Sequence, residues 1–405
     1  MVKTIKYAYF FTFCIVLLTF PLASILGLRT SSKESFINQE KRTITRLPNW
    51  DWKSKSIKKY FSESESFFGD HLAFREDLLK LNAKLKNRLG LPMDAEDVII
   101  GKDGWIFLGN KYQETINQYR GLKQMDAKQI HSFYKYFGDI QDYLKKLNIP
   151  FYIAIAPDKH SIYPEYLPSY LSKKGNTPYD QIMSSNTFLQ IIDLKKALIE
   201  KKKNHKLPLY YKTDSHWNLF GAYLAYWEIL SYFNPSFQSS SIILDETNFT
   251  SRLSQRKTDL SLTIKGESLY NDVEVSIKDK LSKHKLKQMS NNKWVDINPN
   301  RAFEMLNHNL IRNKHKHGKV LVIGDSFSNS LSIYLNNTFG EIKYCHFIKP
   351  GTNDIASLVQ LYKPDFVLFE VVERYLIAPV DHFIPLYKKT KGKSKNILDN
   401  KKNTI

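Results

Sequence analysis

The sequence predicts an α/β fold in which helices cover both faces of a parallel β-sheet. Apolar runs with the length of buried strands alternate along the chain with stretches of helical periodicity, a pattern that is typical of parallel sheets. Polar clusters follow several of the apolar runs, and ligand sites in such sheets lie beyond the carboxyl ends of the strands. These clusters are residues 214–218, 324–328 and 373–375.

The N-terminal segment has the features of a membrane-spanning signal anchor. Two lysines occur within residues 1–6, and residues 7–28 contain no charge before Arg29. A helix needs about 20 apolar residues to cross a bilayer, and this run is longer than the usual apolar core of a cleaved signal peptide. We therefore expect a cytoplasmic N-terminus, a single transmembrane helix and an exported remainder of the chain. A cleaved signal peptide is the alternative.

After the anchor, the chain is expected to form one large domain between two polar segments. Residues 29–60 read as a juxtamembrane linker, and the lysine-rich residues 388–405 read as a disordered tail. The domain itself is expected over residues 61–387. Near its start, apolar residues at helical spacing predict two helices over 57–90, divided at Gly69.

Within the domain, periodicity and turn residues predict the elements in order. Strands are expected at 97–101, 104–109, 150–157, 208–218, the first half of 318–335 and the first half of 364–376. Helices are expected at 127–147, 187–202, 217–233 and the second half of 318–335. Residues 234–315 are polar and partly basic without a clear period, which predicts an irregular insertion.

Composition excludes a disordered chain and leaves the class of anionic neighbour open. Hydrophobic residues make up 42% of the chain, which is enough to build a core. The formal net charge of +20 indicates an anionic polymer, a membrane surface or nucleic acid, or else a general lysine-rich bias. The two cysteines, Cys14 and Cys345, predict neither a disulfide nor a zinc site, and we expect no metal or cofactor.

The stretch "VLVIGDSFS", residues 320–328, places a serine between a predicted strand and a predicted helix. Gly324 allows a tight exit from the strand. Ser326 would then lie on a turn where its hydroxyl is exposed and its backbone N–H points outward, as a nucleophile with an adjacent oxyanion donor requires. The alternative is that Asp325 and Ser326 only cap the following helix.

The stretch "KTDSHWNLFGAY", residues 212–223, supplies the partners that such a serine needs. Residues two apart in an extended segment face the same way, so Asp214 and His216 are expected to converge. A histidine oriented by a carboxylate is the base that takes the proton of a serine. The alternative is that Asp214 caps a helix and His216 is an ordinary polar residue.

Taken together, these motifs resemble one branch of the SGNH hydrolases, the AlgJ/AlgX-like polysaccharide O-acetyltransferases. In most SGNH hydrolases the acid and the histidine follow the serine; here they precede it in a D-x-H-W pattern, as in that branch. "KTDLS", residues 257–261, departs from the branch, whose members often have GDL at this point. The resemblance spans about 70–376 and is carried by residues 71–81, 98–109, 155–168, 210–223, 320–328 and 363–376.

This resemblance implies a fold, a triad and a setting. The fold would be SGNH-like, with Asp214, His216 and Ser326 as the catalytic triad. The protein would be anchored in the bacterial cell membrane and would move acetyl groups onto hydroxyls of an extracytoplasmic polysaccharide. It would have no nucleic-acid partner. A multi-pass membrane acyltransferase would supply the acetyl group.

Weaker candidates surround the predicted site. Asn353, in "GTND", is similar to the asparagine that completes the oxyanion hole of SGNH hydrolases, although asparagine is also an ordinary turn residue. Arg374 and Tyr375 follow the last predicted strand and are candidates for sugar binding, with an ion pair between Glu373 and Arg374 as the alternative. Asp158 and Lys159, which follow another strand, read as structural support, with a place in the lining of the cleft as the alternative.

The sequence leaves three functions open. The first is the O-acetyltransferase. The second is a carbohydrate esterase or deacetylase with the same triad, in which water instead of a sugar resolves the acyl-enzyme. The third is a non-catalytic envelope protein whose basic loops bind an anionic polysaccharide.

Overall fold

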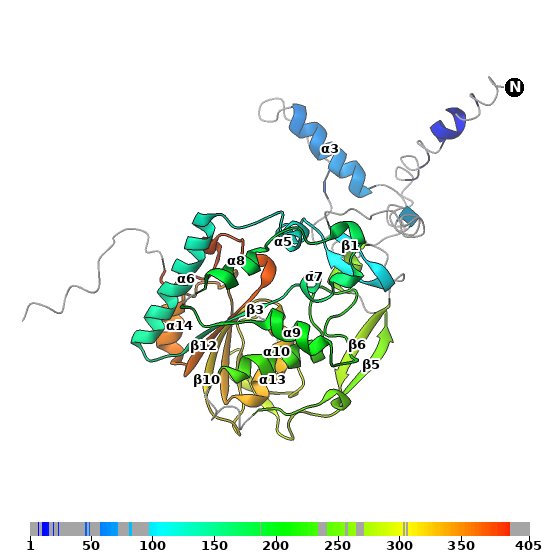
Figure 1. The fold of residues 1–405 in the computed structure, drawn as a ribbon. Helices are drawn as coiled ribbons and strands as arrows, with labels where there is room; N and C mark the ends of the chain where they lie inside the picture. The colour runs from blue at the N-terminus through cyan, green and yellow to red at the C-terminus, as the bar shows by residue number, and fades with distance from the viewer. Residues whose placement is uncertain are drawn as a thin grey trace, which may run out of the picture.

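The structure is a computed structural model of the 405-residue chain, shown in Figure 1. It describes residues 57–71 and 97–388, with gaps at 187, 234–240, 256–257, 265–270, 303 and 305–306, and a few positions nearer the N-terminus. An eight-stranded sheet forms the centre of the described part, and two two-stranded sheets accompany it.

The central sheet is mixed, with strand order β4-β3-β12-β10-β11-β9-β7-β8. Its parallel strands are β3 (Phe151–Ala156), β4 (Ile191–Ile192), β10 (Lys319–Gly324), β11 (Glu341–His346) and β12 (Phe366–Val372). Three antiparallel strands extend one side: β9 (Leu310–Arg312), β7 (Leu286–Ser290) and β8 (Lys293–Ile297). The prediction of a parallel sheet is therefore confirmed for five strands and wrong for three.

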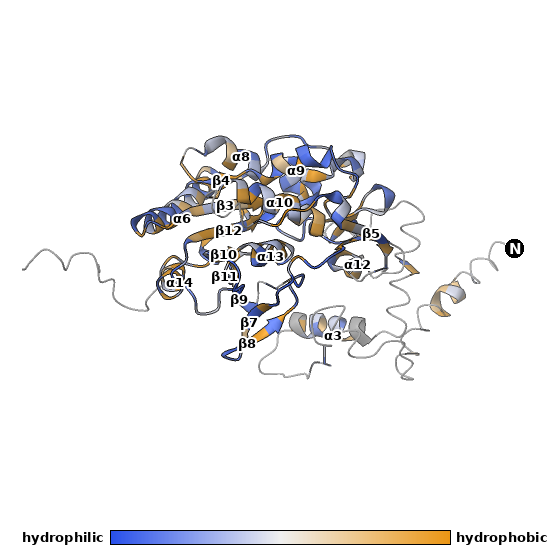
Figure 2. Ribbon diagram, turned by 90° about the horizontal axis from the view of Figure 1, so that it is seen from below, coloured by the Kyte–Doolittle hydropathy of each residue, from blue (hydrophilic) through white to orange (hydrophobic). Residues whose placement is uncertain are grey.

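Helices cover both faces of this sheet, as predicted. In Figure 2, α6 and α14 lie on one side of the column of strands, and α10 and α13 lie on the other. The longer helices around the central sheet are α6 (Ala127–Lys146), α8 (Pro178–Ser185), α9 (Leu194–Lys202), α10 (Leu219–Ser231), α13 (Phe327–Thr338) and α14 (Ile355–Tyr362).

Side chains along the buried strands point alternately to the two faces of the sheet and form a separate hydrophobic core on each face. On β10, Val320 and Val322 pack with α10 and α13. Leu321 and Ile323, which face the other way, pack with α6, α8 and α14. Because both faces are buried, the strand reads as an unbroken apolar run, which is why its position is predictable from the sequence.

The chain order places the carboxyl ends of three strands beside one another. The chain moves outward from β3 to β4 in one direction and from β10 to β11 in the other, and β12 pairs with both β3 and β10. Ligand sites of open α/β sheets lie at such a reversal of strand order. The residues that follow β3, β10 and β12 begin with Pro157, Asp325 and Glu373.

Residues 234–315 are more regular than predicted. Besides β7, β8 and β9, they contain an antiparallel pair of strands, β5 (Phe249–Ser254) and β6 (Asp272–Ile277), with α12 (Asp259–Ile264) between them in the chain. The strands here are only partly buried; β5, for example, buries only Phe249. A strand without a buried face has no strong alternation, so periodicity does not reveal it.

The first described elements differ in part from the prediction. The short strands β1 (Val98–Ile100) and β2 (Ile106–Leu108) pair antiparallel as expected. Helix α3 (Ile57–His71) runs through Gly69 instead of ending there, because one glycine costs a helix only about 1 kcal/mol relative to alanine.

Much of residues 7–28, of the linker and of the tail lies outside the described residues. Among the residues that the structure describes, no helix combines the length and the apolar stretch needed to cross a membrane.

Candidate active site

Ser326 occupies the turn between β10 and α13, as predicted, and the capping role falls to its neighbour. Asp325 accepts the backbone N–H of Phe327 on Oδ1 at 2.9 Å and that of Val372 on Oδ2 at 2.9 Å. The Ser326 side chain makes no capping hydrogen bond and is partly exposed. Its hydroxyl is therefore available for another partner.

Gly324 is required because the turn is crowded. A Cβ at this position would lie 2.4 Å from Oγ of Ser328 and 3.0 Å from Oε2 of Glu370. Glu370 is fully buried, accepts the Ser328 hydroxyl at 2.7 Å and the Asp325 N–H at 3.2 Å, and has a pKa that burial raises well above its usual range. Glu370 has no sequence signal of this role, because it lies within the otherwise apolar β12.

Asp214 and His216 converge, although not by the predicted strand alternation. Residues 211–216 form a bend closed by a bridge between Tyr210 and Trp217. Within it, Oδ1 of Asp214 accepts the backbone N–H of His216 at 3.1 Å and lies 2.6 Å from its Nδ1. The α10 N-cap is Asn218, whose side chain accepts the N–H groups of Phe220 and Gly221, so Asp214 does not cap that helix.

The structure brings the three side chains together. Nε2 of His216 lies 2.7 Å from Oγ of Ser326, at the opposite end of the ring from Asp214. The Trp217 indole donates to the carbonyl of Phe327 at 3.0 Å, and the Phe327 ring lies 4.9 Å from the imidazole. These contacts dock the loop of His216 onto the first turn of α13. The arrangement allows the imidazole to take the serine proton while the carboxylate holds its tautomer.

The groups around His216 set the pKa of its imidazole, and therefore the pH range in which it can act as a base. Burial lowers its pKa, but the hydrogen bond and the charge of Asp214, with the charge of Asp259, outweigh burial and raise the pKa above its ordinary value. Only the neutral imidazole accepts a proton from Ser326.

We therefore expect activity to rise with pH through a midpoint above the ordinary histidine value of about 6.5. The pH dependence of kcat/KM for an activated acetyl ester measures this midpoint. A midpoint at or below the ordinary value would contradict the assignment of His216 as the base.

The loop that carries the acid and the base is held by a buried lysine. Lys159, in α7 (Lys159–Ile162) just after β3, donates from Nζ to the carbonyls of Tyr211, Lys212 and Asp214 at 3.1, 2.9 and 2.8 Å. An ammonium has three donors, and all three are used. Burial lowers the pKa of Lys159 to about 8.

Replacing Lys159 with methionine is expected to lower the free energy of unfolding by roughly 2–3 kcal/mol, because carbonyls would be left buried without a donor. Denaturant unfolding measures the change. Lys135→Met is the control: the Lys135 side chain is 63% exposed and pairs with Asp139 on the surface, so its loss should cost less than about 1 kcal/mol. Equal stabilities of the two variants would contradict this role of Lys159.

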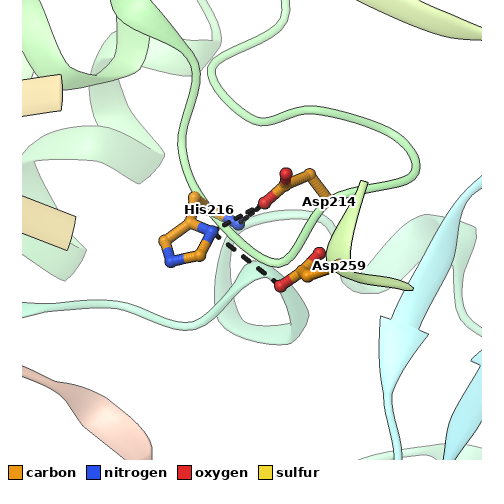
Figure 3. Close-up of side chains that lie close together, drawn as sticks. All are labelled: Asp214, His216 and Asp259. Carbon is orange, nitrogen blue, oxygen red and sulfur yellow. Dashed lines mark hydrogen bonds and ion pairs between the residues drawn. The ribbon is translucent and has the colours of Figure 1, made fainter. Parts of the chain in front are cut away.

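A second carboxylate, which the sequence analysis missed as a site residue, lies next to the first. Oδ2 of Asp259, at the start of α12, is 3.9 Å from Nδ1 of His216 (Figure 3). Ligand atoms of Asp214, His216 and Asp259 all lie within 4.8 Å of one another, as a metal site would require. However, Nδ1 is hydrogen-bonded to Asp214, and both oxygens of Asp259 accept hydrogen bonds from Ser215. The donor set thus fits a hydrogen-bonded network better than a metal centre.

Arg374 forms an ion pair, which was the alternative to sugar binding. Its partner is Asp158 and not the predicted Glu373. It is 8% exposed, and its Nη1 donates to Oδ1 of Asp158 at 2.5 Å. Glu373 instead pairs with Lys195 at 2.9 Å and accepts the N–H of Asp158 at 3.0 Å. Arg374 and Asp158 therefore brace the segments that follow β12 and β3.

The other weak candidates, Tyr375 and Asn353, also make contacts within the protein. Tyr375 is half-buried, with its ring edge-on to Phe347 at 5.7 Å. Asn353 donates from Nδ2 to the carbonyl of Pro350 in its own turn at 2.7 Å. Binding of sugar by Arg374 or Tyr375, and of an oxyanion by Asn353, stay predictions.

Comparisons with known proteins identify the family of this chain. A family model described as the SGNH hydrolase-like domain of the acetyltransferase AlgX matches residues 98–341, a range that includes Asp214, His216 and Ser326. A comparison with curated proteins finds no match.

A comparison with solved structures finds several that are similar to this chain. A DHHW family protein from Eubacterium siraeum is 13% identical with a TM-score of 0.50, over 72% of this chain and 96% of that chain. Bacillus cereus PatB1, solved with a sulfonyl adduct, is 19% identical with a TM-score of 0.48, over 71% and 97%. The O-acetyltransferase domain of Pseudomonas putida AlgJ is 17% identical with a TM-score of 0.41, over 70% and 92%. At 13% identity, the likeness to the DHHW family protein concerns the fold alone.

The match of the family model confirms the resemblance drawn from the motifs. It covers more than half of the 405 residues and includes the D-x-H-W and GDS motifs. The chain belongs to the family of SGNH hydrolase-like domains typified by the acetyltransferase AlgX.

Proposed function

We propose that this chain is an O-acetyltransferase that carries an acetyl group on Ser326 and passes it to hydroxyls of an extracytoplasmic polysaccharide. The observation that carries the proposal is the continuous hydrogen-bonded path from Asp214 through His216 to Ser326, with contacts of 2.6 and 2.7 Å. Membership of the acetyltransferase family supports acetyl as the group transferred.

In the first half-reaction, Oγ of Ser326 attacks the carbonyl carbon of the acetyl donor, and its proton moves to Nε2 of His216. Asp214 stabilises the resulting imidazolium. Among the described residues, the Ser326 N–H donates to no protein acceptor, so it is available to the developing oxyanion. The tetrahedral intermediate then expels the donor's leaving group, which takes the proton from His216, and acetyl-Ser326 remains.

In the second half-reaction, a sugar hydroxyl takes the place of the leaving group. Nε2 of His216 removes the hydroxyl proton, and the sugar oxygen attacks the acetyl carbonyl carbon. The intermediate collapses with cleavage of the bond to Oγ, and the imidazolium returns its proton to Ser326. The products are the O-acetylated sugar and the free enzyme.

The proposed setting rests on the sequence. The uncharged run of residues 7–28, preceded by Lys3 and Lys6, supports a single-pass anchor with the catalytic domain on the extracytoplasmic side. An acetyl donor on that side would come from a multi-pass membrane acyltransferase, as the family resemblance implies.

The test separates transfer from hydrolysis. The full-length chain is incubated with an activated acetyl ester, with and without unacetylated oligosaccharides, and O-acetyl sugars and free acetate are quantified. We expect acetyl sugars to form at the expense of acetate in the presence of a suitable glycan. Release of acetate that no glycan alters would favour the esterase, and no release at all would favour the polysaccharide-binding protein.

A further inference from the structure

The imidazole of His216 faces two carboxylates that come from distant parts of the chain. Asp214 belongs to the same loop and binds Nδ1 at 2.6 Å. Asp259 comes from α12, and its Oδ2 lies 3.9 Å from the same nitrogen. Figure 3 shows both carboxylates directed toward the Nδ1 side of the ring, which leaves Nε2 for Ser326.

Asp259 is held in place by the residue between the acid and the base. The backbone N–H of Ser215 donates to Oδ1 of Asp259 at 2.9 Å, and the Ser215 hydroxyl donates to Oδ2. The same hydroxyl lies 3.4 Å from Nδ1 of His216, so Ser215 stands between the second carboxylate and the ring. Next to Asp259, the Thr258 hydroxyl donates to the carbonyl of Thr213. The start of α12 is thus fastened to the catalytic loop at two points.

We propose that Asp259 is a positioning residue for the general base, which fixes the loop through Ser215 and stabilises the positive charge that His216 acquires when it takes the proton of Ser326. The inference rests on the proposed function, because it assigns Asp259 a part in the same proton transfer. Asp259 belongs to residues 234–315, which the sequence predicted to be an irregular insertion. The proposal gives this acid a role beside the reaction centre.

The charges around His216 favour this role. Two carboxylates, Asp214 and Asp259, face the ring, and the guanidinium of Arg374 opposes them from beyond β12. Lys159 also contacts the loop, but its ammonium donates hydrogen bonds to three backbone carbonyls. Burial and the charge of Asp214 raise the pKa of Asp259, while His216 and the donors of Ser215 lower it. An imidazolium between the two acids relieves their mutual repulsion, so the charged form of His216 is stabilised more than one carboxylate alone would allow.

Asp272 provides a matched control, because it contacts the same loop from another element. It lies in β6, is 1% exposed, and accepts the N–H groups of Lys212 and Thr213 at 2.9 and 3.2 Å. It therefore supports the loop as Asp259 does, but its oxygens bind the opposite end of the bend and make no hydrogen bond with His216 among the described residues. Asp272→Asn removes loop support and a nearby charge without removing the carboxylate that faces the ring.

The experiment compares full-length wild type with Asp259→Asn, Ser215→Ala and Asp272→Asn. Two quantities are measured: the pH midpoint of acetyl-ester turnover, and the pKa of the His216 imidazole by NMR. For Asp259→Asn we expect both to fall by about one pH unit or more, because a unit charge near 4 Å shifts a pKa by nearly one unit in water and by more at a partly buried site. Ser215→Ala should shift them in the same direction by less. Asp272→Asn should lower the thermal midpoint of unfolding and leave the pH midpoint in place.

The outcomes separate this inference from the proposed function. If wild type turns over the ester but Asp259→Asn leaves both midpoints unchanged, the role of Asp259 is overturned while the triad stands. If Asp272→Asn shifts them equally, general loop support explains the effect and the role is overturned as well. If wild type forms no acetyl-enzyme, the proposed function fails, and the NMR titration still reports whether Asp259 stabilises charged His216.

Discussion

Replacing Ser326 with alanine is expected to reduce acetyl transfer by about ten-thousand-fold or more, because it removes the only atom that carries the acetyl group in the proposed mechanism. The fold should survive. Ser326 makes no capping hydrogen bond, and Asp325 supplies the contacts that hold the turn to Phe327 and Val372. Initial rates with an activated acetyl ester, together with a thermal unfolding curve, measure both effects.

Ser330→Ala is the matched control for this variant. Ser330 lies one turn further along α13 and is partly exposed, so the substitution has a similar effect on the helix without touching the hydroxyl beside His216. Its activity should stay close to that of wild type. Substantial turnover by Ser326→Ala, or unchanged acetylation of the polysaccharide in cells that carry it, would instead support a non-catalytic binding protein.

Replacing Asp214 with asparagine is expected to cost about ten-thousand-fold in kcat, the size of effect seen when the acid of a serine triad becomes an amide. An asparagine oxygen can still accept the backbone N–H of His216, which Asp214 accepts at 3.1 Å, so the bend is retained. The amide carries no charge to stabilise the imidazolium and can hold the ring in the wrong tautomer. The kcat of the two enzymes with saturating ester measures the loss.

Asp259→Asn serves as the comparison, because it neutralises the carboxylate at 3.9 Å instead of the one at 2.6 Å from Nδ1. The loss of kcat should be far smaller for Asp259→Asn than for Asp214→Asn. Equal losses would mean that the two acids share the role of the triad acid, and a small loss for Asp214→Asn would remove it from the triad.

The sequence predicted the centre of the fold well, because buried elements leave strong local patterns. Strands β3 and β10 are apolar runs, β12 is apolar apart from Glu370, and α6 and α10 have the expected helical stretches. The turn after Gly324 and the polar residues after β12 could be placed at one edge of the sheet because parallel strands share an edge. The meeting of His216 with Ser326 followed from the chemistry of a serine nucleophile, not from any local pattern.

Residues that act through long-range contacts gave weaker signals. Asp259 lies in "KTDLS", which drew notice only because the family often has GDL there, and nothing in that stretch shows that Asp259 reaches the loop 214–216. Lys159 followed a predicted strand, but the three carbonyls that it binds lie more than fifty positions later in the chain. Contacts of this kind depend on how elements pack, which periodicity does not encode.

The partner of Arg374 illustrates the same limit over a still greater separation in the chain. The sequence suggested an ion pair with the adjacent Glu373, whereas the guanidinium binds Asp158, which follows a neighbouring strand. Pairing of β12 with β3 brings the two segments together, with Val372 opposite Ala156. Strand order across the sheet therefore decides the partner, and the sequence alone did not provide that order.

The central claim is that Ser326 becomes acetylated because His216 removes its proton. Its most direct test is mass spectrometry of the full-length chain, quenched in acid shortly after mixing with an activated acetyl ester. The account predicts a mass gain of one acetyl group on the peptide that contains Ser326, which is lost when an acceptor glycan is added and fails to appear in His216→Ala. An acetyl group on another residue, or one on Ser326 that forms equally fast without His216, would contradict it.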